Sequence, residues 1–221
     1  MKRELLQTAD GSETIHLPEI DEQYHSKHGA LQESKHVFIK MGLKHVIPRI
    51  KELSILEIGF GTGLNALLTF FEAKENNLKV EYTTVEAYPV IVSEWSALNY
   101  GKMIDHNNAQ QVFEQMHSVA WETAINLSDN FIIQKQQKKF ESITDNNTYD
   151  LIYFDAFGAR VQPELWTESI FNIMYTAMKK GGVLVTYAAK GSARRAMQAV
   201  GFEVERLEGP PGKREMLRAT K

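Results

Sequence analysis

Three glycines at alternating positions follow an apolar segment in the stretch LEIGFGTGLN, which spans residues 56–65. Glycine adopts backbone angles that other residues avoid, and it lets a ligand lie close to the main chain. A glycine-rich turn between a strand and a helix is a common feature of nucleotide sites. This stretch could therefore hold a dinucleotide, a phosphate group, or a nucleoside ligand that has no phosphate.

The spacing of Gly59, Gly61 and Gly63 distinguishes these ligands. A dinucleotide fingerprint has two residues between its second and third glycines, and here Leu64 occupies that third position. A phosphate-binding Walker loop needs Gly-Lys-Ser or Gly-Lys-Thr, which this stretch lacks. What remains is an acid-x-Gly-x-Gly-x-Gly motif beginning at Glu57, a pattern that suits S-adenosylmethionine. A tight turn that binds no ligand is the alternative.

A second acidic residue, Glu86, ends the next apolar segment after the glycine motif. One carboxylate can accept hydrogen bonds from both hydroxyls of a ribose. Dinucleotide folds share this feature, so Glu86 supports a nucleoside ligand without identifying it. The alternative is a solvated carboxylate at the end of a strand.

The stretch YFDAFGARVQPELW carries a third acid, Asp155, at the end of another apolar segment. Open α/β sheets place ligands and chemistry at the carboxyl ends of their strands. Aromatic residues surround this acid, namely Tyr153, Phe154, Phe157 and Trp166. Asp155 is therefore a candidate for substrate chemistry, and the alternative is a loop cap beside core aromatics.

Alternating strands and helices must position these residues. We expect strands at residues 54–58, 81–85, 131–133, 150–154 and 183–187. We expect helices at residues 63–72, 88–100, 109–124, 166–179 and 192–200, the fourth stopped by Gly181 and Gly182. Such alternation predicts a parallel sheet covered on both faces. Final strands at 202–207 and 215–219 have only a short turn between them, so they must pair antiparallel. The predicted class is α/β, a Rossmann-like class I S-adenosylmethionine-dependent methyltransferase with a mostly parallel sheet and an antiparallel last strand.

The N-terminal segment predicts an extension of this fold. Residues 4–8 and 14–17 flank Asp10-Gly11, which is a β-hairpin signal. Apolar residues at helical spacing predict a helix at 31–43. We therefore expect a hairpin-and-helix extension over residues 1–45, packed on a methyltransferase domain over residues 46–221.

The composition limits the other functional classes. The 221 residues include 43% hydrophobic and 24% charged residues and no cysteine, which excludes disulfides and thiolate metal sites. No apolar run is long enough for a signal peptide or a membrane span, so we expect a cytoplasmic protein without membrane contact. The net charge of −3 argues weakly against a nucleic-acid coat protein, although residues 190–221 hold eight Lys and Arg against four Asp and Glu.

The chain resembles the methyltransferase domain of the bifunctional tRNA 5-methylaminomethyl-2-thiouridine biosynthesis proteins, the MnmC family, and their stand-alone relatives. Four segments in the same order carry the resemblance: YHSKHGALQESKHVFI, EIGFGTGLN, FDAF with PELWTESIFN, and GFEVERLEGPPGKREML. It implies methyl transfer from S-adenosylmethionine to the primary amine of 5-aminomethyl(-2-thio)uridine at the tRNA wobble position. The fused proteins add an FAD-dependent oxidase domain after the closing hairpin, so the resemblance implies no flavin here.

The resemblance also implies roles for individual residues. The residues implied to line the cofactor site are Glu57, Gly59, Phe60, Gly61, Thr62, Gly63, Asn65, Glu86 and Asp155. The family has a Gly-Asp pair near the adenine where this chain reads FIIQKQQKK, so contacts to the adenine would come from Gln134, a backbone group or elsewhere. Asp155 is the implied catalytic residue. The implied substrate contacts are Phe157, Trp166, Arg160, Lys213 and Arg214.

The implied partners are the tRNA anticodon stem-loop and separate enzymes that make the aminomethyl group. His25 and His28 lie three apart, but no further metal ligand accompanies them, so we expect no metal. Two alternatives stay open. One is a methyltransferase of the same fold that acts on a small-molecule or protein amine, which the negative net charge would suit. The other is an inactive relative that binds RNA. A nicotinamide dehydrogenase fits least, because the glycine spacing is wrong.

Overall fold

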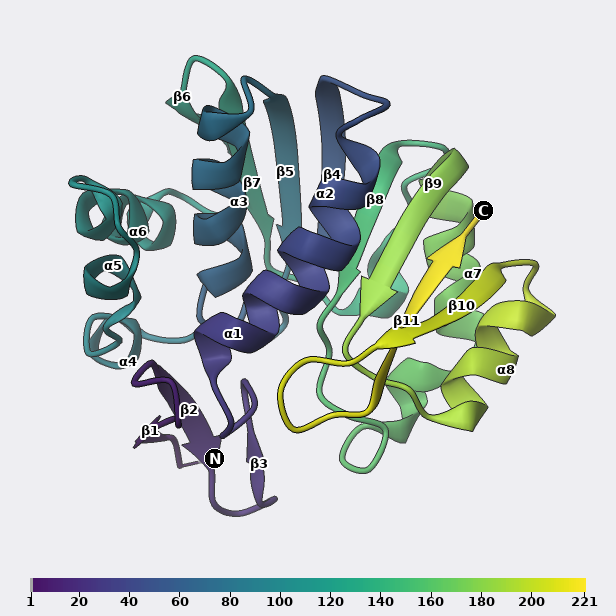
Figure 1. The fold of residues 1–221 in the computed structure, drawn as a ribbon, viewed down its shortest axis with the longest axis horizontal. Coiled ribbons are helices and arrows are strands. Elements are labelled where there is room, and N and C mark those ends of the chain that lie inside the picture. Colours follow the sequence, from purple (N-terminus) through teal and green to yellow (C-terminus); the bar gives the residue numbers. More distant parts are fainter. Residues whose placement is uncertain (1) are drawn as a thin grey trace.

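An eight-stranded sheet forms the centre of the protein, with the strand order β10-β11-β9-β8-β4-β5-β7-β6. The structure is a computed structural model that describes residues 2–221 (Figure 1). The strands of this sheet are β4 (Glu52–Ile58), β5 (Lys79–Val85), β6 (Ala124–Ser128), β7 (Phe131–Gln136), β8 (Tyr149–Phe154), β9 (Met178–Thr186), β10 (Glu203–Glu208) and β11 (Glu215–Thr220). Strands β7, β5, β4, β8 and β9 run parallel, whereas β11 is antiparallel to both β9 and β10. The predicted parallel sheet with a reversed C-terminal hairpin is confirmed.

Helices cover both faces of this sheet, because its central strands are apolar on both sides. The helices after the glycine motif are α3 (Leu64–Glu75), α4 (Val92–Trp95), α5 (Tyr100–Met103), α6 (Ala109–Ser118), α7 (Glu168–Ala177) and α8 (Gly191–Ala199), with short 3-10 turns η2 (Phe140–Ser142) and η3 (Pro163–Trp166). All six residues of β8 are buried, as expected of a central strand. One apolar cluster joins the sheet to α3 and α6, and a second joins it to α7 and α8.

Three of the expected helices have different limits. The helix expected at 88–100 is a loop with the single turns α4 and α5, because Pro89 lacks an N–H and disfavours helix in the residue before it. The helix expected at 109–124 ends at Ser118 and is followed by β6, an edge strand whose half-exposed side chains give a weak signal. The helix expected at 166–179 starts after the extended Thr167 and ends at Ala177, before Gly181 and Gly182.

The N-terminal segment forms a small antiparallel sheet of β1 (Glu4–Gln7), β2 (Glu13–Leu17) and β3 (Glu22–Gln23). The hairpin of β1 and β2 was predicted, and the two-residue β3 was not. Figure 1 shows this sheet below the large sheet, at the carboxyl ends of its parallel strands. The division into an extension of residues 1–45 and a domain of residues 46–221 stays a prediction.

One continuous helical segment links the small sheet to the large one. It consists of α1 (Ala30–Ser34), the π-helical η1 (Lys35–Leu43) and α2 (Lys44–Val46). The ring of Phe38 lies 5.2 Å from that of Tyr153 in β8, so the helix packs directly on the sheet. None of the helices among residues 2–221 has the length and apolar character that crossing a membrane requires.

Gly42 lies where this helix crosses the sheet most closely. A Cβ at Gly42 would lie 2.9 Å from Val185 Cγ2 and 3.4 Å from the Tyr153 ring. We expect Gly42→Ala to force the helix away from the sheet and to lower the free energy of unfolding by about 1–3 kcal/mol. Urea denaturation measures this change. Gly191→Ala, at the exposed start of α8, is the matched control and should change stability by less than about 1 kcal/mol.

Candidate active site

A cavity of about 640 Å³ opens at the carboxyl ends of β4, β5 and β8. Its floor is the glycine motif, and its roof comes from the N-terminal extension. The cavity lies within the usual size range of ligand sites. The predicted residues that line it are Gly59, Phe60, Gly61, Thr62, Asn65, Glu86, Asp155 and Phe157. One cavity therefore brings together residues from the three strand ends that the sequence analysis singled out.

The glycine motif forms a turn that other residues could not form. Gly59 and Gly61 have φ angles of +90° and +49°, a region that L-residues with side chains rarely adopt. A Cβ on Gly59 would lie 3.0 Å from the carbonyl oxygen of Asp155, and one on Gly61 would lie 3.0 Å from the Tyr24 ring. The bare backbone is therefore needed for the turn to lie against β8 and beneath Tyr24.

Glu57 and Gly63 belong to the motif but lie behind the cavity wall. Gly63 precedes α3 and packs against His117. Glu57 is completely buried, and burial raises the pKa of its carboxyl well above the usual range. Neither of its carboxyl oxygens has a hydrogen-bond partner among residues 2–221. Glu57 lies beneath the turn and is not among the residues that line the cavity, so its contact with the cofactor stays a prediction.

Glu86 closes the other side of the turn. Its carboxylate accepts the backbone N–H of Gly61 at 3.1 Å and that of Tyr88 at 2.8 Å. These two bonds fix the carboxylate at the edge of the cavity. A carboxylate has about four lone-pair sites, so Glu86 can still accept the hydroxyls of a ribose.

Asp155 faces the cavity immediately after β8. Its backbone N–H donates to the Ile58 carbonyl at 3.0 Å, and its Oδ2 accepts a hydrogen bond from Asn65 Nδ2 at 2.8 Å. Burial raises the pKa of Asp155 to about 7, and the nearby Glu33 carboxylate raises that pKa further, while Asn65 and Lys213 lower it. At neutral pH the carboxyl is therefore divided between its two protonation states. It can both accept a proton and bind a cation.

Two predicted contacts lie away from the cavity. Gln134 is in the middle of β7, two residues before the strand ends, and is not among the residues that line the cavity. Its contact with the adenine stays a prediction. Phe140 and Glu141 of η2 line that side of the cavity instead. Trp166 is 5% exposed, packs on Phe154, and donates its indole N–H to the Phe157 carbonyl at 2.8 Å. It holds the loop after Asp155 in place and does not flank the opening.

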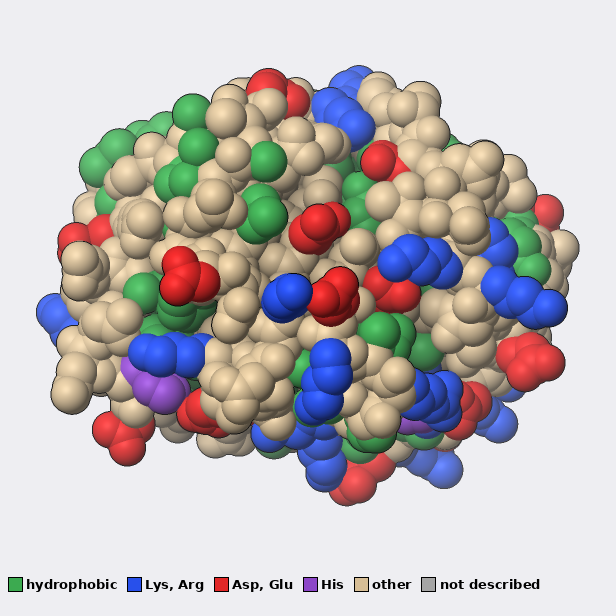
Figure 2. All heavy atoms as spheres, turned by 90° about the horizontal axis from the view of Figure 1, so that it is seen from above, with side chains coloured by type: hydrophobic (Ala, Val, Ile, Leu, Met, Phe, Trp, Pro, Cys, Tyr) green, Lys and Arg blue, Asp and Glu red, His purple; other side chains and the backbone are tan. Residues whose placement is uncertain are grey.

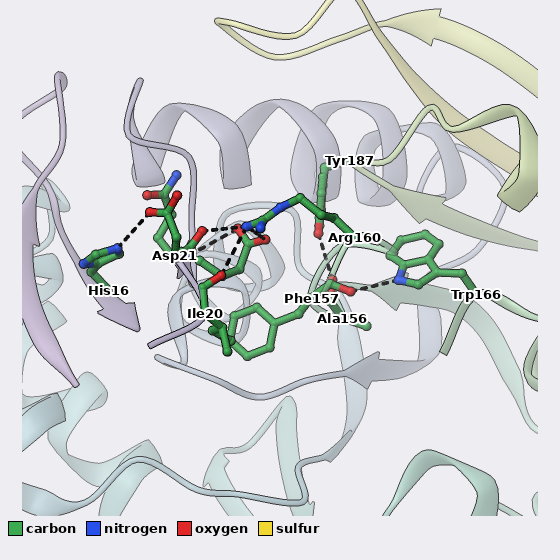
Figure 3. Close-up of polar contacts among 10 residues, drawn as sticks. His16, Ile20, Asp21, Ala156, Phe157, Arg160, Trp166 and Tyr187 are labelled. Carbon is green, nitrogen blue, oxygen red and sulfur yellow. Dashed lines mark hydrogen bonds and ion pairs between the residues drawn. The ribbon is translucent and has the colours of Figure 1, made fainter. Parts of the chain in front are cut away.

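Arg160 and Lys213, which were predicted to contact the substrate, instead bind other groups of the protein. Figure 3 shows the Arg160 guanidinium turned toward the main chain of Ile20 and Asp21, and its Nη2 donates to the Asp21 carbonyl at 2.6 Å. Arg160 thus holds the turn that carries Ile20 into the cavity wall. Lys213 forms an ion pair with Glu33 rather than pointing to solvent. Arg214 is exposed and makes no side-chain hydrogen bond or ion pair with the part of the chain that the structure describes.

The N-terminal extension supplies cavity residues that the sequence analysis did not assign to the site. They are Arg3, Leu17, Ile20, Tyr24 and His25. The Tyr24 ring lies over the glycine turn and meets Phe157 edge to face at 5.0 Å. His25 Nδ1 lies 3.1 Å from Thr14 Oγ1, and burial lowers the pKa of His25 to about 4. Contacts between such distant segments leave no local sequence pattern.

His28 does not join His25 in a metal site. It packs against Gly212 in the turn between β10 and β11, where a Cβ would clash with the imidazole. Among residues 2–221, no three His, Cys, Asp or Glu side chains lie close enough to hold a metal ion.

The fold and this cavity define a class of protein, the Rossmann-like methyltransferases. Residues 103–221 match the family model of an S-adenosyl-L-methionine-dependent methyltransferase. The chain belongs to this family, and its methyl donor is S-adenosylmethionine.

Curated relatives and solved structures agree with this assignment. The chain is 27% identical over 214 residues to the tRNA 5-methylaminomethyl-2-thiouridine biosynthesis bifunctional protein MnmC of Marinomonas sp., covering 91% of the chain and 31% of the relative. It is 27% identical over 228 residues to the MnmC protein of Polaromonas naphthalenivorans, covering 95% and 34%. The chain thus spans about a third of the length of these relatives.

Two crystal structures share the fold. MnmC2 from Aquifex aeolicus superposes with a TM-score of 0.82 at 24% identity, covering 99% of this chain and 69% of that one. A spermidine synthase in complex with the transition-state analogue AdoDATO superposes with a TM-score of 0.59 at 15% identity, covering 99% and 68%. The sheet and the N-terminal extension are therefore a known arrangement.

The raised pKa of Asp155 predicts a pH-dependent cost in stability. The Asp155 carboxyl holds its proton more tightly in the folded state than in the unfolded state. The stability that comes from this bound proton is fully present below pH 3.8 and is lost as pH rises through about 7. We expect Asp155→Asn, which cannot ionise, to be more stable than the parent by about 1–3 kcal/mol at pH 8.5, and by much less at pH 5. Urea unfolding at the two pH values measures the difference.

Asp129→Asn is the control for this measurement. Asp129 is exposed in the turn between β6 and β7, far from the cavity. Its substitution should give the same small effect at both pH values. A gain for Asp155→Asn that does not grow with pH would contradict the assigned protonation.

Proposed function

We propose that the protein transfers a methyl group to the primary amine of 5-aminomethyl(-2-thio)uridine at the wobble position of tRNA. The observation that carries this proposal is the Asp155 carboxyl, which faces the cavity beside the glycine turn with a pKa of about 7. An amine acceptor needs a nearby group that binds its ammonium form and removes its proton. The printed names of the curated relatives support the tRNA substrate.

The residues of the cavity fit the methyl donor. The Gly59–Gly61 turn offers bare backbone, and Glu86 can hold ribose hydroxyls. Thr62 and Asn65 line the cavity and add polar residues to its wall. Phe140 and Tyr88 supply apolar surface for a base. S-adenosylmethionine supplies a methyl group on a positively charged sulfur, and the acidic cavity favours that charge.

Asp155 acts on the acceptor. An alkylamine with a pKa near that of lysine is mostly protonated at pH 7, and only the neutral nitrogen has the lone pair for attack. The Asp155 carboxylate hydrogen-bonds this ammonium, aligns it, and accepts one proton from it. An aspartate of ordinary pKa would be a weak base at pH 7, whereas the raised pKa of Asp155 is matched to the task. Asn65 keeps the Asp155 carboxylate oriented through its 2.8 Å hydrogen bond.

Phe157 is the aromatic residue placed to hold the wobble base. It lines the cavity two residues after Asp155, and Tyr24 supports its ring. Base–aromatic stacking contributes about 1–3 kcal/mol per base. The wobble base would leave its stack and lie on Phe157, with its aminomethyl group toward Asp155. Separate enzymes would have to make this aminomethyl group.

Exposed cations near the cavity would bind the anticodon stem. They are Arg214 in the turn before β11, with Lys190 and Arg195 at the start of α8. By contrast, Figure 2 views the end of the protein away from the cavity, where Lys and Arg side chains lie among Asp and Glu. We expect the phosphates of the anticodon stem to bind Arg214, Lys190 and Arg195.

A small-molecule or protein amine is the second candidate acceptor. The acidic side chains Glu86, Glu94, Glu141, Asp155 and Glu164 line the cavity and would suit any cationic amine. The net charge of −3 agrees with such an acceptor. The transfer experiment below separates the two candidates.

The test incubates the protein with methyl-labelled S-adenosylmethionine and bulk tRNA from cells blocked at the aminomethyluridine stage. Mass spectrometry of the digested tRNA should place the label in 5-methylaminomethyl(-2-thio)uridine. Asp155→Asn should keep cofactor binding and lose at least about 100-fold in turnover, because it cannot accept the proton. No label in tRNA despite cofactor binding would move the acceptor to the second candidate, and full turnover by Asp155→Asn would remove Asp155 from the mechanism.

Arg214→Glu tests the tRNA surface. Reversal of one exposed charge that contacts a phosphate should weaken tRNA binding at least about tenfold and reduce the salt dependence of the binding constant. The matched control is Lys51→Glu, an exposed cation just before β4 at the opposite end of the molecule. Filter binding at several salt concentrations measures both variants. Equal losses in the two variants would indicate a non-specific charge effect and contradict the assigned surface.

A further inference from the structure

Lys213 points inward from the turn between β10 and β11 and meets two groups there. Its Nζ pairs with the carboxylate of Glu33 in α1, and the same Nζ lies 3.8 Å from the centre of the Tyr187 ring. The Lys213 side chain is 32% exposed and the Glu33 side chain 7%. Because Glu33 is buried, solvent and salt screen the attraction between these two charges less than in a pair on the surface.

The surrounding backbone fixes this pair in one geometry. The second oxygen of Glu33 accepts the Ser26 N–H at 2.8 Å, so the carboxylate cannot swing away. Gly212, with a φ angle of +83°, packs directly against His28, which anchors the turn that carries Lys213. The turn over residues 209–214 therefore ties the C-terminal hairpin to the N-terminal segment. Figure 1 shows this turn beside the start of α1.

Tyr187 connects the Lys213–Glu33 pair to the backbone next to Asp155. The Tyr187 hydroxyl donates to the carbonyl of Ala156, the residue after Asp155, at 2.9 Å (Figure 3). The charge of Glu33 raises the pKa of Asp155, and the charge of Lys213 lowers it. The charge of Asp155 in turn raises the pKa of Glu57 in β4, Tyr82 in β5 and Tyr187 directly after β9. The charged side chains that line the cavity with Asp155 are Arg3, Glu86, Glu94, Lys139, Glu141 and Glu164. The charges that shift the pKa of Asp155 are nevertheless those of Glu33 and Lys213.

We propose that Glu33 and Lys213 form a pair of positioning residues that controls how readily Asp155 holds a proton. Neither side chain lines the cavity, so each acts through Asp155 rather than on the substrate. Glu33 alone would hold Asp155 protonated and unable to accept a proton. Lys213 offsets that effect, and it also places the turn over residues 209–214 against the site. This inference extends the proposed amine methylation and rests on it for its catalytic consequence.

The decisive experiment measures the Asp155 carboxyl directly. Its carboxyl carbon is titrated by carbon-13 NMR, with Asp155→Asn used to assign the signal. The variants are Lys213→Met, Glu33→Gln and the double variant, with Lys213→Arg as the charge-conserving control. Gln at position 33 keeps an oxygen that can accept the Ser26 N–H.

Removal of one charge at a time should move the titration in opposite directions. We expect Lys213→Met to raise the pKa of Asp155 by about one unit and Glu33→Gln to lower it by about one unit. The double variant and Lys213→Arg should titrate close to the parent. Unchanged titration in both single variants, or a shift of both in the same direction, would overturn the proposal.

Turnover of the same variants is measured separately from the NMR titration. If Asp155 accepts the proton from the amine, Lys213→Met should reduce turnover about fivefold at pH 7 and recover it near pH 9, because one pKa unit changes the ionised fraction by that amount. Absence of turnover in the parent protein would count against the proposed substrate and would leave the NMR result standing. The parent protein could show turnover, and the two single variants could shift the pKa of Asp155 in opposite directions. If their pH–rate profiles then matched that of the parent, the catalytic part of the inference would be contradicted.

Discussion

The backbone contact between Gly59 and Asp155 is the constraint on which the site depends. The Asp155 N–H donates to the Ile58 carbonyl at 3.0 Å, and the missing Cβ of Gly59 leaves room for the Asp155 carbonyl. This contact extends the β4–β8 pairing past the ends of both strands. It places the turn for the methyl donor and the carboxyl for the acceptor in one cavity. Since displacement in a methyl transfer needs donor and acceptor in line, such positioning can lower the barrier by several kcal/mol.

Burial of acidic groups is the second feature of this site, and it opposes stability. Burial raises the pKa of Glu57 beneath the turn, and the Asp155 carboxylate accepts a hydrogen bond from the side chain of Asn65. A buried carboxyl with few partners favours its neutral form, which is why the pKa of Asp155 rises to about 7. The roof formed by Tyr24 and His25 maintains this burial, because it separates the cavity from solvent. The N-terminal extension is thus part of the chemistry as well as of the fold.

The sequence predicted the parts of the site that follow from local patterns. Gly59 and Gly61 reveal the turn because only glycine tolerates its backbone angles, and Asp155 follows a fully apolar strand whose end must lie at the sheet edge. Side-chain direction was not predictable in the same way. An aromatic residue such as Trp166 can face a ligand or the core, and a lysine such as Lys213 can point to solvent or to a buried acid. The structure decides both through contacts between distant segments, Trp166 with the Phe157 carbonyl and Lys213 with Glu33. The cavity roof was missed for the same reason, whereas the edge strand β6 was missed because its half-exposed side chains give a weak pattern.

A crystal structure of the protein with S-adenosylhomocysteine tests the central claim most directly. The measured quantities are the place of the ribose and the distance from the ligand sulfur to the Asp155 carboxylate. The account predicts the ribose hydroxyls on Glu86 and the sulfur at the opening between the glycine turn and Asp155, with room for an amine between sulfur and carboxylate. A ligand bound elsewhere, or one with its sulfur turned away from Asp155, would contradict it.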